Sequence, residues 1–280
     1  MTTASASASP IVILAGAGRF PFYVAQEAKR MGRKVIIFAL SGWADPSLAA
    51  QADAHEELAV GHLGRLITRL HAHGVTQGIM AGKVTKRVLL ESRATFDQEM
   101  LALLAPLKEF SVSSVLGAIA KRLAAEGVTL LDSSILLHSA LCPPGPLTSR
   151  RPTTVEEADI RLGAQVARAM AALDVGQTVV VKQGVVIAVE ALEGTDAAIR
   201  RAHALAGEGL VVVKTAAATQ DRRFDLPFIA AGTLAVLQET HASCLAVEAG
   251  STLLLERDEW LPKAEASNIC VVGIDIPTAS

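Results

Sequence analysis

The sequence has little of what marks several classes of protein. Its three cysteines, Cys142, Cys244 and Cys270, are scattered without the close spacing of a zinc site or a disulfide framework, which indicates a reducing compartment. No apolar run reaches the length of about 20 residues that a membrane-spanning helix requires. Basic residues do not outnumber acidic ones, and the net charge of −2 argues against a nucleic-acid binder.

The N-terminus also lacks the features of a secretory signal. The first ten residues, MTTASASASP, contain neither a basic beginning nor an apolar stretch, and their small side chains predict a disordered tail over 1–10. Together with the missing membrane span, this predicts a cytoplasmic protein with at most peripheral contact with a membrane.

What the sequence has in abundance is material for buried cores. Apolar residues, chiefly Ala, Val and Leu, make up 51% of its 280 residues, and a chain of this length typically forms two domains. Strands and helices alternate in both halves, which predicts the α/β class for each. We expect a Rossmann-like parallel sheet over 11–142 and a second α/β domain over 153–280. The Pro- and Gly-rich stretch 143–152 between them is typical of an extended linker.

A glycine-containing turn stands near the beginning of the first half. A short apolar strand, Ile11–Leu14, runs into Gly16-Ala17-Gly18-Arg19-Phe20-Pro21, and a periodic helix then covers 22–31. Glycine lets backbone N–H groups at a helix N-terminus approach a phosphate or a sugar. Pro21 stands where the G-x-G-x-x-G pattern of dinucleotide-binding proteins has its third glycine, so a tight turn without a ligand stays open.

A second turn of this kind follows the predicted strand Val75–Met80. Gly82 and Lys83 stand at its carboxyl end, which is where α/β proteins bind ligands. A phosphate or uridine site would use these residue types, but a solvated lysine in an ordinary turn fits the pattern as well.

The stretch 178–229 concentrates charge at the ends of its elements. Two Val-rich strands, Thr178–Lys182 and Val185–Glu190, are separated by Gln183-Gly184, which predicts a tight hairpin. A third strand ends in Lys214 and leads to a loop with Asp221, Arg222, Arg223 and Asp225. Strand ends gathered at one rim could hold a divalent metal ion on carboxylates and a phosphate on cations. The alternative is that each is a solvated charge at a strand end.

The same stretch resembles a known family. The string QGVVIAVEALEGTD, then Lys214, then DLPFIA from Asp225 is similar to the pattern of the UDP-2,3-diacylglucosamine diphosphatases of the metal-dependent, non-calcineurin type. That pattern reads Q-G-x-V-L-A-V-E-A-x-E-G-T-D, then a lysine loop, then D-L-P-T-I-G, so Phe228 and Ala230 replace a Thr and a Gly. The turn from Gly16 to Pro21 resembles the family's A-G-G-G-x-L-P, and AGKV around Gly82 resembles its A-G-x-V.

The resemblance implies a cytoplasmic hydrolase of lipid A biosynthesis, with peripheral contact at the inner face of the inner membrane. It would use Mg²⁺ and water to split UDP-2,3-diacylglucosamine into UMP and 2,3-diacylglucosamine 1-phosphate, or lipid X. We expect catalytic roles for Asp225, Lys214 and Arg223, and metal ligation by Asp225 and Glu190. The residues expected to bind substrate are Gly16, Gly18, Phe20, Pro21, Gly82, Lys83, Gln183, Gly184, Glu193, Gly194, Thr195 and Asp196.

Two other functions stay open at this point. A non-catalytic nucleotide- or lipid-binding protein could use the same fold and the same turns. A Rossmann-type dehydrogenase is disfavoured because the third glycine is absent and no acidic residue ends the predicted strand Lys34–Leu40. Whether the chain forms a homodimer is likewise open.

Overall fold

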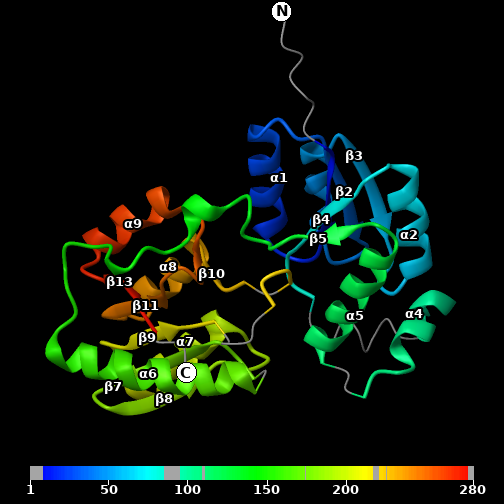
Figure 1. The fold of residues 1–280 in the computed structure, drawn as a ribbon. Helices are drawn as coiled ribbons and strands as arrows, with labels where there is room; N and C mark the ends of the chain where they lie inside the picture. The colour runs from blue at the N-terminus through cyan, green and yellow to red at the C-terminus, as the bar shows by residue number, and fades with distance from the viewer. Residues whose placement is uncertain are drawn as a thin grey trace, which may run out of the picture. The chain divides into compact units, whose positions relative to one another are not determined.

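The computed structural model describes residues 9–84, 95–108, 111–173, 175–216, 221–224 and 226–276, so most of the predicted tail lies outside it. The chain divides into two compact units (Figure 1). The N-terminal unit comprises Met1–Leu137 and Asp221–Asp225, and the C-terminal unit comprises His138–Gln220 and Leu226–Ser280. Both are α/β, as the sequence predicts, but the expected continuous second domain is interrupted where the chain returns to the first unit.

The N-terminal unit is built on a five-stranded parallel sheet of order β3-β2-β1-β4-β5. Helix α1 (Phe20–Arg30) lies on one face, and α2 (Leu63–Ala72), α4 (Gln98–Leu104) and α5 (Val112–Ala125) lie on the other (Figure 1). Because both faces are covered, β1 and β2 are continuous, buried apolar runs. The strands are β1 (Ile11–Ala15), β2 (Val35–Leu40), β3 (Ala54–Leu58), β4 (Gln77–Ala81) and β5 (Thr129–Leu130).

The strand order of this sheet reverses between β1 and β4. The chain leaves β1 through α1 toward β2, whereas it leaves β3 through α2 and crosses to β4 on the other side of β1. In doubly wound sheets, ligands bind beyond the carboxyl ends of the strands at such a reversal. Here the turns after β1 and β4 contain Gly16 and Gly82, the glycines of both predicted ligand turns.

The C-terminal unit is built on a six-stranded sheet of order β6-β13-β11-β9-β7-β8. Strands β9, β11 and β13 are parallel, while β7 is antiparallel to β9 and forms a hairpin with β8. A short separate pair joins β10 (Phe228–Ile229) and β12 (Leu253–Leu254). The six strands are β6 (Gly145–Pro146), β7 (Thr178–Lys182), β8 (Val185–Val189), β9 (Val211–Lys214), β11 (Cys244–Glu248) and β13 (Cys270–Ile274).

Helices cover both faces of the C-terminal sheet. Because side chains alternate along a strand, Val211 and Val213 of β9 pack with Ile160 of α6 (Thr154–Ala172), while Val212 packs on the opposite face. That opposite face is covered by α7 (Thr195–Ala206), α8 (Ala231–Glu239) and α9 (Arg257–Ala266). Helix α6 begins at a capping box, in which the Thr153 hydroxyl accepts from the backbone of Glu156 and the Glu156 carboxylate accepts from that of Thr153.

The stretch predicted to be a linker, 143–152, is instead packed into the C-terminal unit. Gly145 and Pro146 form β6, an edge strand that pairs antiparallel with Gly273 and Val272 of β13. The backbone N–H of Leu147 donates to the Val271 carbonyl at 2.8 Å. The linker prediction is therefore wrong. Pro146 lies in an edge strand, where its missing N–H costs no ladder hydrogen bond.

The predicted hairpin between β7 and β8 is confirmed. The backbone of its turn is hydrogen-bonded to a buried aspartate. Gln183 and Gly184 have φ values of 49° and 78°, as a two-residue type I′ turn requires. Their backbone N–H groups donate to the Asp159 carboxylate of α6 at 2.8 and 2.6 Å. Asp159 is only 2% exposed. The two N–H groups are thus satisfied within the fold, although Gln183 and Gly184 were expected to bind substrate.

We expect Asp159→Ala to lower the free energy of unfolding by about 2–4 kcal/mol, because two N–H groups would lose a charged acceptor. Chemical denaturation measures this change. Arg161→Ala, on an exposed position of the same helix, is the matched control and should change stability by about 0.5 kcal/mol or less. Equal effects of the two substitutions would show that Asp159 does not hold the turn.

Candidate functional site

The two predicted ligand turns of the N-terminal unit, Gly16–Gly18 and Gly82–Lys83, lie against each other. We call them the switch-point turns. The N–H of Ala17 donates to the Lys83 carbonyl at 3.1 Å, and the N–H of Lys83 donates to the Ala17 carbonyl at 2.8 Å. A Cβ atom on Gly16 would lie 2.7 Å from the Lys83 carbonyl oxygen. Gly82 has a φ of +96°, and its Cβ would lie 2.7 Å from the Gly16 carbonyl carbon. Both glycines are therefore required by the backbone.

The first turn leads into the N-terminus of α1. Gly18 has a φ of +93°, with open space around the position that a Cβ would occupy. No side chain caps the helix at Arg19, so its N-terminal dipole suits an anion. Phe20 and Pro21 were also expected to bind substrate. Both are buried in the first turn of α1.

The segment 221–224 docks on the same sheet. We call it the docked segment. Ser133, which follows β5, donates its N–H to the Arg222 carbonyl at 2.9 Å, and its hydroxyl lies 2.8 Å from the Arg223 carbonyl oxygen. That hydroxyl also lies 2.9 Å from the carbonyl oxygen of Met80 in β4. Phe224 packs against the core of this unit. Asp225, expected to be the central carboxylate, comes next in the chain and lies outside the described residues.

Both arginines of the docked segment are paired with carboxylates. Arg223 binds Asp221 through two nitrogens at 2.9 and 2.6 Å, which lowers the pKa of Asp221 and raises that of Arg223. The Arg223 guanidinium also lies 5.0 Å above the Phe224 ring. Arg222 pairs with Asp132 at 2.8 Å. Arg223, expected to be catalytic, thus shares its charge with a neighbouring carboxylate.

The C-terminal unit brings together another set of predicted residues, which we call the lysine cluster. Lys214, at the end of β9, is 7% exposed. Its Nζ lies 2.9 Å from the Thr195 hydroxyl, 3.3 Å from the Thr178 hydroxyl and 3.9 Å from Glu190 Oε2. Burial raises the pKa of Glu190, but the Lys214 cation and the hydrogen bonds from Thr178 and Thr195 outweigh it, so the net shift is downward. The predicted gathering of charges at a sheet rim is confirmed for these residues.

The neighbours of Thr195 in the EGTD motif have other partners. Glu193 pairs with Arg201 at 2.5 Å and accepts from the N–H of Ala191. Gly194 is the N-cap residue of α7, with a φ of 83°. Asp196 lies 3.4 Å from the hydroxyl of Thr233. In this motif, Thr195 is the side chain that reaches the lysine cluster.

The structure reveals a buried ion pair that the sequence analysis missed. Arg168 of α6 lies 2.8 Å from Glu248 at the end of β11, and Glu248 also accepts from the N–H of Ala216 at 2.9 Å. Glu248 is 7% exposed. The position of Glu248 at a strand end could have identified it, because Glu190 and Lys214 were identified by the same kind of position. Arg168 sits in mid-helix, where no local pattern distinguishes it.

Glu190, expected to be a magnesium ligand, has other partners in this structure. One oxygen of its carboxylate accepts from Thr195 at 2.9 Å, and the other faces the Lys214 ammonium. In this structure Glu190 is the ion-pair partner of Lys214, whose positive charge opposes the binding of a metal ion beside it. Metal ligation by Glu190 stays a prediction. Among the described residues, no group of three or more His, Cys, Asp or Glu side chains is arranged to hold a metal ion.

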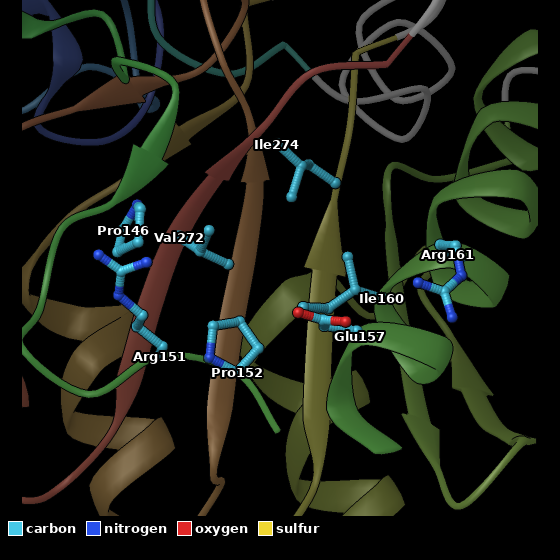
Figure 2. A pocket seen from close by; sticks show the side chains of 8 residues that line it. All are labelled: Pro146, Arg151, Pro152, Glu157, Ile160, Arg161, Val272 and Ile274. Atoms are coloured by element: carbon cyan, nitrogen blue, oxygen red, sulfur yellow. The ribbon is translucent and has the colours of Figure 1, made fainter. Parts of the chain in front are cut away.

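A pocket of about 370 Å³ lies elsewhere in the C-terminal unit (Figure 2). None of the predicted site residues lines it, so it is not part of the candidate site. The pocket is lined by Pro146, Arg151, Pro152, Glu157, Ile160, Arg161, Val272 and Ile274.

Fold and site define an α/β protein of two units, with a doubly wound sheet and facing glycine turns in one and a buried lysine cluster in the other. The family model described as "LpxI N-terminal domain" matches residues 10–140, and "LpxI C-terminal domain" matches residues 143–272. Together the two models cover most of the chain, which therefore belongs to the LpxI family.

A curated relative spans nearly the full length. It is the "UDP-2,3-diacylglucosamine pyrophosphatase LpxI" of Caulobacter vibrioides, 28% identical over 275 residues that cover 94% of this chain and 96% of the relative. In the part that the structure describes, none of the helices combines the length and apolar character needed to cross a bilayer.

Among solved structures, the similarities are partial. A GalE-like L-threonine dehydrogenase from Cupriavidus necator shares 19% identity at a TM-score of 0.28, covering 42% of this chain and 34% of its own. The biotin carboxylase domain of a single-chain bacterial carboxylase shares 16% identity at a TM-score of 0.29. That match covers 61% of this chain and 36% of the other chain. This chain thus spans about a third of the length of each.

Proposed function

We propose that this chain hydrolyses the pyrophosphate bond of UDP-2,3-diacylglucosamine, giving UMP and 2,3-diacylglucosamine 1-phosphate for lipid A biosynthesis. The observation that carries the proposal is the match of both halves to the two domains of one family, whose relative in Caulobacter vibrioides bears the name of this activity. The non-calcineurin type of diphosphatase is the class that the motifs in 183–230 support.

In this proposal the switch-point turns hold the nucleotide diphosphate. Support comes from the close approach of Gly16 to the Lys83 backbone, the open space at Gly18, and the uncapped N-terminus of α1. Backbone N–H groups and the α1 dipole would face the phosphate oxygens, and Lys83 would add a cation. The uridine end would lie at the carboxyl edge of β1 and β4, where doubly wound sheets bind ligands.

The reaction needs a group that takes a proton from water. Water attacks one phosphorus, the bridging P–O bond breaks, and the released phosphate keeps the electron pair. We propose Asp225 as the key carboxylate, either as the base that accepts this proton or as the ligand of a metal ion that activates the water. Arg223, held by Asp221, and Lys214, held by Thr178 and Thr195, are the proposed cations that offset charge on phosphate oxygens.

Metal dependence is a further part of the proposal. A bound Mg²⁺ would neutralise charge on the pyrophosphate, and Mg²⁺ takes only one or two protein carboxylates. With Glu190 engaged by Lys214, we propose Asp225 as the carboxylate that would hold it.

We expect the purified protein to release UMP from UDP-2,3-diacylglucosamine and to lose this activity in EDTA, with recovery when excess Mg²⁺ is added. UMP is quantified by chromatography over time. Activity that EDTA leaves unchanged would remove the metal from the proposal. Binding of the substrate without UMP release would favour the alternative, a non-catalytic nucleotide- or lipid-binding protein.

A further inference from the structure

The docked segment stands far from the rest of the N-terminal unit in sequence, yet it is tied to that unit by backbone contacts. Ser133 contacts two successive carbonyls of the segment, that of Arg222 through its N–H at 2.9 Å and that of Arg223 through its hydroxyl at 2.8 Å. Ser133 is only 1% exposed. Since its hydroxyl also lies 2.9 Å from the Met80 carbonyl, one side chain joins the end of β4 to the segment.

The residues on either side of Ser133 form a second anchor. Asp132 binds the Arg222 guanidinium at 2.8 Å through one carboxylate oxygen. Its other oxygen accepts from the N–H and the hydroxyl of Ser134 at 2.7 and 2.6 Å. The Ser134 hydroxyl in turn accepts from Arg222 at 3.0 Å. Arg222 is therefore held by an ion pair with Asp132 and by a hydrogen bond to Ser134.

A third anchor lies at the end of the segment. Phe224 packs into the apolar core formed by β1, β2, α2 and α5. Its N–H donates to the Asp221 carbonyl at 3.1 Å, which closes a turn. The backbone is thus fixed on both sides of Arg223, and Asp225 is the next residue after the last anchor.

We propose that Asp132-Ser133-Ser134 is a positioning site for the reaction, which holds the docked segment, the residues that immediately precede Asp225 in the chain, beside the carboxyl ends of β4 and β5. The inference rests on the proposed function. Ser133 touches no substrate in it and acts through the backbone of Arg222 and Arg223. Met80, two residues before Gly82, places the same hydroxyl beside the switch-point turns.

A positioning role has a kinetic signature that a purely structural role lacks. In Ser133→Ala the Arg223 carbonyl loses its hydroxyl partner, so the segment should shift while the switch-point turns stay in place. Because a displacement of about 1 Å can cost on the order of 100-fold in rate, we expect kcat to fall about 10- to 100-fold with KM changed less than about twofold. Ser133→Thr keeps the donor and should recover part of the rate.

The test compares Ser133→Ala, Ser133→Thr and Ser113→Ala, the last being an exposed serine of α5 in the same unit. Steady-state kinetics of UMP release is paired with hydrogen–deuterium exchange of a peptide that contains 221–224. We expect faster exchange in that peptide and a lower kcat for Ser133→Ala alone. An unchanged kcat, or a loss of kcat and stability without faster exchange in that peptide, would overturn the proposal.

The two proposals fail in different ways. If the wild-type protein releases no UMP, the proposed function fails, and the catalytic purpose of the positioning site fails with it. In a second case, the wild-type protein is active, and Ser133→Ala shows faster hydrogen–deuterium exchange in the 221–224 peptide but keeps its full kcat. Ser133 then anchors the segment without a positioning role in the reaction, and the proposed function stands.

Discussion

Asp225→Ala is expected to lower kcat for UMP release by about 10²–10⁴-fold, the range for loss of a general base. The substitution removes the carboxylate that the proposal assigns to the attacking water. The anchors of the docked segment, Ser133 and Phe224, precede Asp225 and would remain. We therefore expect the folded state and UDP binding to be retained, as measured by denaturation and calorimetry.

Asp221→Ala is the matched control, because Asp221 is the other aspartate of the same loop. Its carboxylate is taken up by two nitrogens of Arg223. Removing it frees Arg223 and loosens the turn, so we expect a loss of about tenfold or less in kcat. A near-normal rate in Asp225→Ala together with an inactive Asp221→Ala would assign the reaction to the other aspartate.

Gly82→Ala is expected to weaken UDP binding by about 100-fold or more. The added carbon would lie 2.7 Å from the Gly16 carbonyl carbon and 2.8 Å from the Ala17 carbonyl oxygen, so the switch-point turns must move apart. The φ of +96° adds a strain of roughly 1–2 kcal/mol for a residue other than glycine. Both effects act on the backbone that the proposal places against the phosphates.

Gly117→Ala is the control for this substitution, because it is the same change in α5 of the same unit with no atom within 4 Å of the new carbon. We expect it to bind UDP like the wild-type protein and to be slightly more stable. Calorimetric titration with UDP compares the two variants after denaturation has established that both are folded. Wild-type affinity in a folded Gly82→Ala variant would move the nucleotide site away from these turns.

Most elements were predictable because their signals are local. The buried strands β1 and β2 are continuous runs of β-branched and other apolar residues, and Gln183-Gly184 has the composition of a hairpin turn. Strand β3 was missed because its sequence, AHEEL, is charged, as suits an edge strand paired with β2 alone. Strand β6 was missed because Pro146 is read as a chain breaker, although an edge strand accepts it.

The arrangement of the candidate residues was predictable in part, where glycine or strand-end charge marks them. The facing turns at Gly16 and Gly82 and the approach of Lys214 to Glu190 and Thr195 follow from residues placed at strand ends. The return of the chain to the N-terminal unit did not follow, because it depends on a serine and its contacts with residues far along the sequence. The ion pair of Glu190 with Lys214 did not follow from the sequence either, because a carboxylate at a strand end suits a metal ion or a lysine equally well.

Product analysis of a single reaction tests the central claim most directly. UDP-2,3-diacylglucosamine is incubated with the wild-type protein, and all products are identified by mass spectrometry. The account predicts UMP and 2,3-diacylglucosamine 1-phosphate in equal amounts, at a rate that falls sharply in Asp225→Ala. Release of UDP with the free acylated sugar, or an intact substrate after binding, would contradict pyrophosphate hydrolysis by this chain.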